Sequence, residues 1–130
     1  GSNGCENGWR IRTPVTQLDI LPTITDLLGY RLQGEEYGGS SLLGPLSRDR
    51  TLMFSCLADN YCLASLQGTK KYIYHLDNQA EEFFDLSKDP SERENLAEER
   101  SPEELEDRRS ELLEWRATLN SKYGITPSAE

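Results

Sequence analysis

Cysteine, histidine and methionine are scarce in this 130-residue chain, which has three, one and one of them. Cys5, Cys56 and Cys62 have neither the spacing of a zinc site nor the even number expected of a disulfide framework. Cys56 and Cys62 flank a predicted tight connection between two strands and could face each other. We expect two buried thiols there, and the redox compartment stays open.

Long apolar runs and an excess of basic charge are also missing. The longest apolar stretch, residues 18–28, is interrupted by polar residues and by Pro22, and it is far shorter than the ~20 apolar residues of a membrane span. Lys and Arg number 14 against 23 Asp and Glu, a net charge of −9 that argues against nucleic acid as a partner. Most of the acidic residues follow Glu81 and are interpreted as a solvated helix face rather than a docking tail. No membrane contact is predicted.

The ends of the chain carry little pattern. Residues 1–12 show no clear period and are predicted to be irregular, and Gly1-Ser2 resembles an expression scar rather than a signal peptide. Residues 13–124 are predicted to form one subdomain, and residues 125–130 a frayed tail. Localisation stays open, since export or membrane anchoring would depend on segments upstream.

The first regular element is predicted to be a short helix. Apolar positions 20, 21, 24, 27 and 28 fall on one side of a 3.6-residue period. Thr16 is suited to the N-cap and Gly29 to the C-terminal cap. Pro22 has to lie in the first turn, so the regular helix is predicted to begin near Leu21.

A period of two follows the glycine-rich loop of residues 30–50. Residues 51–57, 61–66, 70–76 and 82–86 are predicted strands, rich in aromatic and alternating residues. The links between them, residues 58–60, 67–69 and 77–80, are short enough to join only antiparallel neighbours. The sequence therefore predicts a four-stranded meander.

A long carboxy-terminal helix completes the predicted fold. Asp89 is expected to cap a short helical turn, and Ser101 to cap a helix that ends at Gly124. Leu105, Leu112 and Leu119 with Trp115 give that helix one apolar side, which must lie on the sheet. The fold class is α+β: a four-stranded antiparallel sheet packed against a long C-terminal helix, preceded by one shorter helix.

Several motifs, in order, resemble those of the sulfatases. Residues 13–29 are similar to the family segment V-S/T-x-V/L-D-I/L-x-P-T-L/I-x-D-L-x-G, and residues 82–97 to E-L-Y-D-L-x-x-D-P-x-E-x-x-N-L-A. Between them, residues 39–46 resemble the G-x-S-L-x-P-x-L loop and residues 71–73 the K-Y/L-I strand. Each motif alone is weak, but their order and spacing agree over roughly residues 13–120.

This resemblance implies an alkaline-phosphatase-superfamily protein with a large α/β catalytic domain followed by a smaller sheet-and-helix part. The large domain of such enzymes binds a divalent cation, usually calcium, and carries a formylglycine made from the first residue of Cys/Ser-x-Pro/Ala-x-Arg. None of the three cysteines has an Arg at the required offset, and no Asp-Asp or Asp-His-Gly metal motif occurs. We therefore expect no catalytic residue, no metal ligand and no cofactor in this segment.

The resemblance predicts a structural C-terminal subdomain that braces an upstream catalytic domain hydrolysing sulfate esters and shapes one wall of its cleft. The same subdomain could belong to a phosphodiesterase or phosphoglycerol-transferase relative. It could also be a free-standing interaction module. Alone, the chain is expected to be inactive and to self-associate through apolar surface at residues 9–15 and 21–28.

Three residues are candidates for the rim of a substrate cleft. His75 is the only histidine, and we interpret it first as a structural residue of a strand because no partner for it is evident. Arg10 and Arg12 alternate before Pro14 and suit a sulfate group, although a salt-bridged edge strand is the simpler explanation. Asp19 and Asp26 share a helix face, but two carboxylates are too few for calcium, so capping and solvation explain them.

Overall fold

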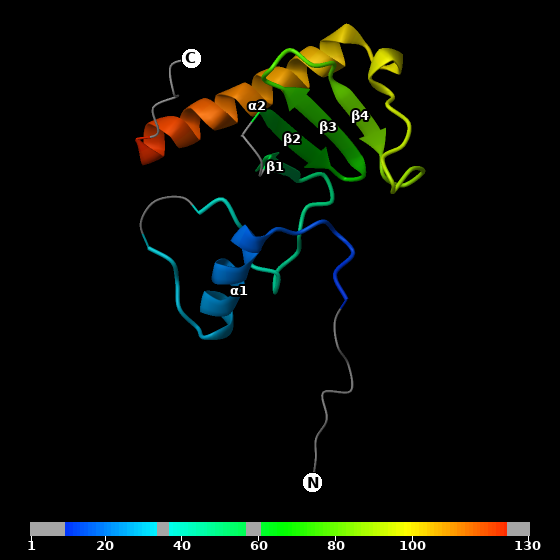
Figure 1. Cartoon of the computed structure of the whole chain (residues 1–130). Coiled ribbons are helices and arrows are strands. Elements are labelled where there is room, and N and C mark those ends of the chain that lie inside the picture. Colours follow the sequence, from blue (N-terminus) through cyan, green and yellow to red (C-terminus); the bar gives the residue numbers. More distant parts are fainter. Residues whose placement is uncertain (1–9, 34–36, 57–60, 125–130) are drawn as a thin grey trace. The chain divides into compact units, whose positions relative to one another are not determined.

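The computed structural model describes residues 10–33, 37–56 and 61–124 of the chain (Figure 1). They belong to two compact units, Gly1–Arg50 and Thr51–Glu130. Each unit is described by itself. The single subdomain predicted over residues 13–124 stays a prediction.

The first unit contains one short helix that follows a 3-10 turn. The turn η1 spans Gln17–Asp19, and α1 spans Ile20–Leu27, so the helical segment starts slightly before the predicted position. Thr16 is the N-cap, as predicted, and its backbone N–H donates to Asp19 Oδ2 at 2.8 Å. Pro22 lies in the first turn of α1, where a missing N–H breaks no helical hydrogen bond.

The second unit is built on the predicted antiparallel meander. β1 spans Thr51–Ser55, β2 Cys62–Gln67, β3 Lys70–His75 and β4 Glu82–Asp85, and they form one sheet in the order β1-β2-β3-β4 (Figure 1). All neighbouring pairs are antiparallel. Residues 58–60, the first predicted link, lie outside the described residues.

One face of this sheet packs against the long helix α2, which spans Pro102–Tyr123 (Figure 1). Leu63, Tyr72 and Phe83 project from three neighbouring strands and meet Ala97 and Leu112 in the hydrophobic core. The removal of these apolar side chains from water is the main driving force that holds such a small unit together. The predicted contact between sheet and helix is confirmed.

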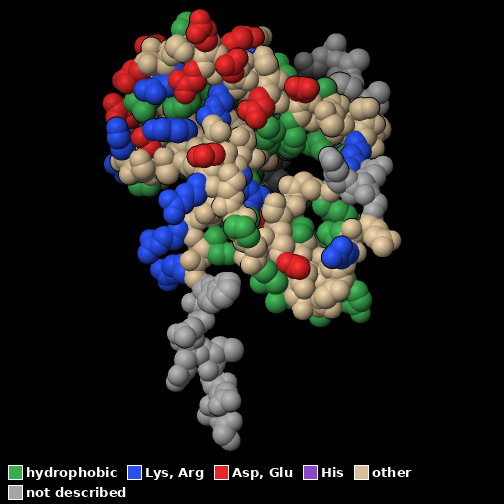
Figure 2. Space-filling model, turned by 180° about the vertical axis from the view of Figure 1, so that it is seen from behind, with side chains coloured by type: hydrophobic (Ala, Val, Ile, Leu, Met, Phe, Trp, Pro, Cys, Tyr) green, Lys and Arg blue, Asp and Glu red, His purple; other side chains and the backbone are tan. Residues whose placement is uncertain are grey.

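The apolar side of α2 agrees with the prediction in most of its residues. Leu112 is fully buried, and Leu105 and Trp115 are partly buried against the same core. Leu119 is half-buried and lies outside this core. Acidic side chains gather over the part of the surface to which α2 contributes, as expected of a solvated helix face (Figure 2).

Both ends of α2 follow from local sequence. Ser101 Oγ accepts a hydrogen bond from the N–H of Glu104 at 3.2 Å, which satisfies one of the unpaired N–H groups of the first turn. Gly124 ends the helix in the left-handed region at φ 63°, a conformation that costs glycine little. None of the described helices is both long and apolar enough to cross a membrane.

The segment after β4 corrects one prediction. Asp89 does cap, accepting hydrogen bonds from the N–H groups of Arg93 and Glu94 at 2.6 and 2.9 Å. However, the residues after it form a turn, not a helical turn, because Glu92 takes a positive φ of 53°. The short helix of this region is η2, at Ala97–Glu99.

Candidate functional site

His75, the only histidine, has a partner that the sequence did not reveal. Its Nε2 lies 2.7 Å from Oε1 of Glu82, and its side chain is 17% exposed. The two residues meet because β3 ends at His75 and the antiparallel β4 starts at Glu82. Since a carboxylate oxygen only accepts, Nε2 carries the proton in this bond, and the ring is held in a fixed orientation. A base oriented in this way is one part of acid–base chemistry.

Arg10 and Arg12 are placed in the first unit, whereas His75 belongs to the second. Both arginines are exposed, and residues 10–12 have no regular secondary structure. Within the described residues no strand pairs with this segment, and the edge strand expected there stays a prediction. The three rim candidates are not brought together within either unit.

The cysteines near His75 correct a further prediction. Cys56 and Cys62 are joined in a disulfide, with their Cα atoms 5.3 Å apart. The N–H of Cys56 donates to the carbonyl of Cys62 at 3.0 Å, so the two residues continue the β1–β2 ladder as a directly opposed pair. This Cα separation lies within the range that a disulfide can span. Cys62 is also the register partner of His75. Cys5 lies outside the described residues.

The family-like residues of β4 and the following turn all bond within the unit. Asp85 accepts hydrogen bonds from Lys70 Nζ at 2.5 Å and from the hydroxyls of Ser87 and Thr69 at 2.6 and 3.2 Å. The hydrogen bond from Lys70 is the main reason that the pKa of Asp85 is lowered below its usual range. The carboxylate is fully engaged in holding the β3 and β4 ends together.

The next two family-like polar residues are engaged in the same way. Asn95 Oδ1 accepts from the N–H groups of Phe83 and Ala97, and its amide donates to the carbonyl of Glu81 at 3.0 Å. The Glu92 carboxylate is 2.6 Å from Lys71 Nζ. These bonds fasten the chain to the edge of β4, where backbone groups would otherwise lack partners.

In the first unit, the family-like Asp19 is buried instead of solvated. It has no exposed surface, and its oxygens accept from both terminal nitrogens of Arg50 at 2.8 and 3.2 Å and from the N–H groups of Thr16 and Ser40, each at 2.8 Å. Burial by itself would raise the pKa of Asp19, but the hydrogen bonds from Arg50, Thr16 and Ser40 outweigh it and lower the pKa. The predicted solvated cap is corrected because Arg50, 31 positions away, supplies the countercharge.

The loop of residues 38–43 is fastened to α1 by further family-like residues. Thr23 Oγ1 donates to the carbonyl of Asp19 at 2.6 Å and accepts from the N–H of Leu42 at 2.9 Å. A Cβ atom on Gly39 would lie 1.9 Å from the backbone oxygen of Leu18, so only glycine allows the loop to approach this closely. The hydrogen bonds of Ser40 and Leu42 therefore make this loop a structural clasp on the start of α1.

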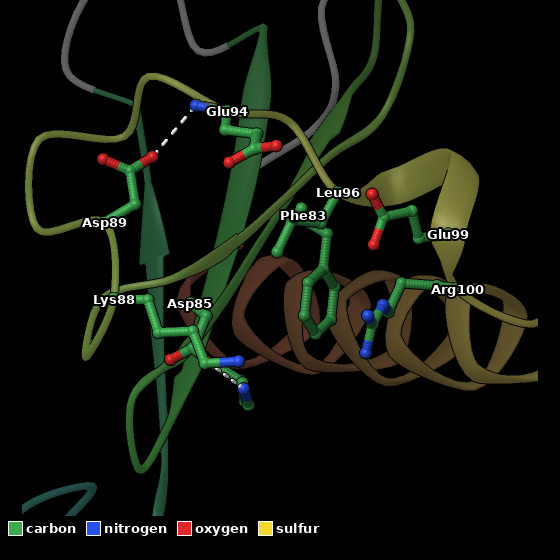
Figure 3. A pocket seen from close by; sticks show the side chains of 9 residues that line it. Phe83, Asp85, Lys88, Asp89, Glu94, Leu96, Glu99 and Arg100 are labelled. Carbon is green, nitrogen blue, oxygen red and sulfur yellow. Dashed lines mark hydrogen bonds and ion pairs between the residues drawn. The ribbon is translucent and has the colours of Figure 1, made fainter.

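One cavity of about 340 Å³ lies in the second unit, between the end of β4 and η2 (Figure 3). We call it the β4–η2 pocket, and it lies within the volume range of small-molecule sites. Its lining residues come from β3, β4, η2 and the intervening turn: Lys70, Phe83, Asp85, Lys88, Asp89, Glu94, Leu96, Glu99 and Arg100. Sequence reasoning missed this pocket because its residues come from separate strands and an irregular turn, and their motif alone does not show that they surround a cavity. No group of three or more His, Cys, Asp or Glu side chains suited to a metal ion is found among the described residues.

Comparison with known proteins places these geometries in context. No family model matches the chain. The Delta 4,5-hexuronate-2-O-sulfatase of Bacteroides thetaiotaomicron is 34% identical over 62% of this chain, which covers 19% of that protein. Among solved structures, a protein of the core locus with which Bacteroides thetaiotaomicron metabolises multiple glycosaminoglycans is 29% identical, with a TM-score of 0.58 over 77% of this chain and 24% of its own. A 2-O glycosaminoglycan sulfatase is 26% identical, with a TM-score of 0.50 over 81% of this chain and 23% of its own. The chain thus spans less than a quarter of these relatives.

Proposed function

We propose that this chain is the structural C-terminal part of a sulfate ester hydrolase, because it is similar in sequence and in fold to part of several sulfatases. It braces the upstream catalytic domain and forms one wall of the substrate cleft. Bond cleavage is carried out by that domain, which supplies the formylglycine nucleophile and the divalent cation, calcium in the family resemblance. No residue of this chain is assigned to the reacting atoms.

The observation that carries this proposal is an uncovered apolar surface on α1. Ile20, Leu21, Ile24, Leu27 and Leu28, which we call the α1 apolar face, are each between 45 and 65% exposed. Hydrophobic side chains reach the surface in several places on the chain (Figure 2), but here four of them lie on one helix and the fifth, Leu28, is its C-cap. Contiguous apolar surface of this kind is typical of an interface. Residues 21–28 are also part of the surface through which the sequence predicts self-association, and that association stays a prediction.

The geometry beneath the α1 apolar face supports a docking role. The Asp19–Arg50 ion pair and the Thr23 hydrogen bonds fix α1 to the loop that follows it. A surface that is already ordered loses less conformational entropy when a partner covers it. The bracing role therefore has a preformed element to act through.

The engagement of the family-like side chains supports a structural role. A general base or a metal ligand needs a free lone pair that faces the reactant. Asp85 and Asn95 instead direct their oxygens to donors from the same unit, and Asp89 caps its own turn. His75, with its ring held by Glu82, remains the side chain best suited to the cleft wall, and exposed Arg10 and Arg12 remain candidates for contacting a sulfate.

The experiment compares this chain with the longer protein of which it is proposed to be part. The longer protein should hydrolyse an aryl sulfate, and residues 1–130 alone should not. In the longer protein, Ile24→Glu should lower the melting temperature, because a charge would be buried at the interface. Leu113→Glu, at a leucine of α2 that is 39% exposed, is the matched control and should change it little.

Two outcomes would contradict the proposal. Metal-dependent sulfatase activity of the isolated chain would show that its own residues are catalytic. Equal melting temperatures of the Ile24→Glu and Leu113→Glu proteins would show that the α1 apolar face is not covered. Sedimentation of the isolated chain adds a check, since the exposed face should make it dimerise as its concentration rises, and Ile24→Glu should weaken that association.

A further inference from the structure

The two edges of the sheet differ in how their backbone groups are satisfied. β4 forms one edge, and the N–H of Phe83 donates to Asn95 Oδ1 at 3.0 Å. The carbonyl of Phe83 accepts from the N–H of Leu96 at 2.8 Å, and the carbonyl of Asp85 accepts from the N–H of Lys88 at 2.9 Å. The segment after β4 therefore occupies the outward groups of this edge, so another strand finds little to pair with there.

β1 forms the other edge of the sheet, and its outer side is open (Figure 1). The N–H of Cys56 donates to the carbonyl of Cys62 in β2, and bonded residues alternate along an antiparallel pair. Counting back from Cys56, every second residue of β1 bonds to β2, and the residues between them direct their N–H and carbonyl groups outward. These outward-facing residues are Thr51, Met53 and Ser55. No partner for their backbone groups is found among the described residues.

The sequence of β1 lacks the features that protect many open edges. Thr51–Ser55 contains no charged residue and no proline, which are two of the means by which sheets prevent unwanted strand pairing. Phe54 is 40% exposed and Ser55 is exposed as well, so the end of the strand is accessible. An uncharged edge of this kind is a template on which a further strand can pair.

The strand is also complementary to a second copy of itself. Residues at equal distances from Met53 are alike, since Leu52 and Phe54 are apolar and Thr51 and Ser55 carry hydroxyls. When two β1 strands pair antiparallel about Met53, Leu52 of each copy lies opposite Phe54 of the other, and the outward N–H groups meet outward carbonyls. Such a contact is isologous, because both partners use the same surface.

We propose that β1 is a docking edge for a second copy of this chain. The two β1 strands pair antiparallel about Met53 and join the two sheets into one. The interface is small because β1 has only five residues, so the association is weak, with a dissociation constant on the order of 0.3 mM. The proposal does not depend on the bracing role, which acts through the α1 apolar face.

The test measures amide hydrogen exchange of the full 130-residue chain by NMR at about 50 µM and about 1 mM. Exchange at the outward amides of Thr51, Met53 and Ser55 should be about two- to threefold slower at the higher concentration, because pairing gives each N–H an acceptor. The amides of Leu52 and Phe54 already bond to β2 and should change less. The same alternation should persist in the Ile24→Glu protein, in which association through α1 is weakened.

A mixed sample of isotope-labelled and unlabelled chain identifies the register. In an antiparallel ladder the non-hydrogen-bonded pairs have the closer Cα atoms, about 4.5 Å apart. Leu52 and Phe54 of the two copies form such pairs when the strands are centred on Met53. An intermolecular NOE between their Hα atoms is therefore expected.

Two substitutions at the edge and one control locate the contact. Phe54→Lys places a charge on the edge, and Ser55→Pro removes an outward N–H that β2 does not use. Each change occurs twice in the dimer and should weaken the association about tenfold, so the concentration dependence at Met53 is lost. Leu113→Lys, at a leucine of α2 that is 39% exposed, is the control and should leave it unchanged. If one edge variant fails to fold, the other decides.

Three results would overturn the proposal. The first is equal exchange at Met53 at the two concentrations. The second is slower exchange without the alternation and without the intermolecular NOE, which would place the contact on another surface. The third is unchanged association of the folded edge variants. The α1 apolar face is tested by the melting temperature of the longer protein, so the two proposals fail separately.

Discussion

Replacing Arg50 with methionine tests how the first unit is held together. The change leaves the Asp19 carboxylate buried with only the Thr16 and Ser40 N–H groups as donors. Removing one partner of a buried ion pair costs about 3–5 kcal/mol. The Arg50 side chain is 14% exposed and Asp19 is not exposed at all, so we expect a value near the lower limit, about 3 kcal/mol.

Hydrogen exchange can measure this loss of stability at individual amides of the first unit. The N–H of Ser40 donates to Asp19, and that of Leu42 donates to Thr23, so both report opening of the loop from α1. A loss of about 3 kcal/mol corresponds to exchange faster by roughly a hundredfold at these two amides. Amides of the β2–β3 ladder belong to the second unit and should be unaffected.

A double-mutant cycle separates the ion pair from other effects. Asp19→Asn alone also destabilises, because the guanidinium then faces an amide. The Asp19→Asn, Arg50→Met double variant should lose less than the sum of the two single losses, by about 1.5 kcal/mol or more. Arg48→Met, at an exposed arginine two positions away, is the control. Exchange within twofold of the parent for Arg50→Met, or strict additivity in the cycle, would refute the reasoning.

Three further predictions concern the second unit. Leu112→Ala should lower the free energy of unfolding by about 2–5 kcal/mol, whereas Leu113→Ala, at a 39% exposed neighbour, should cost under about 1 kcal/mol; equal urea midpoints would contradict the buried side. Reducing the Cys56–Cys62 disulfide, which closes a short loop of sequence separation 6, should cost about 2 kcal/mol, measured with and without reductant. Burial raises the pKa of the Tyr72 hydroxyl above its value in the unfolded chain. The stabilisation that comes from burying the neutral hydroxyl is therefore complete below about pH 10 and is lost as the pH rises further. Above about pH 10, the urea midpoint of the Tyr72→Phe protein should therefore fall less steeply with pH than that of the parent. Midpoints that fall in parallel for the two proteins would refute this.

The elements that could be predicted from sequence are those specified locally. Alternating apolar residues mark the four strands. The short links between them allow each strand to pair only with the next one along the chain, and this defines the meander. The ends of α2 follow from Ser101 and Gly124, which act within one turn. The same holds for Thr16 at the start of η1.

What could not be predicted depends on contacts between distant residues or on irregular backbone. Arg50 reaches Asp19 across 31 positions of a segment without any period, so nothing in the sequence pairs them. His75 and Glu82 are different, because the predicted hairpin already placed them at facing strand ends, and that register could have suggested the pair. The β4–η2 pocket required the positive φ of Glu92, which redirects the chain after β4.

The similarity to sulfatases in this segment is carried by residues whose side chains hold turns and loops. Asp19, Asp85 and Asn95 each accept hydrogen bonds that keep separate pieces of backbone together. Exchanging any of them leaves backbone or side-chain donors without partners, and this penalty destabilises the fold itself. The part of the shared pattern that these three residues carry is therefore explained by the fold, because each of them bonds within its own unit.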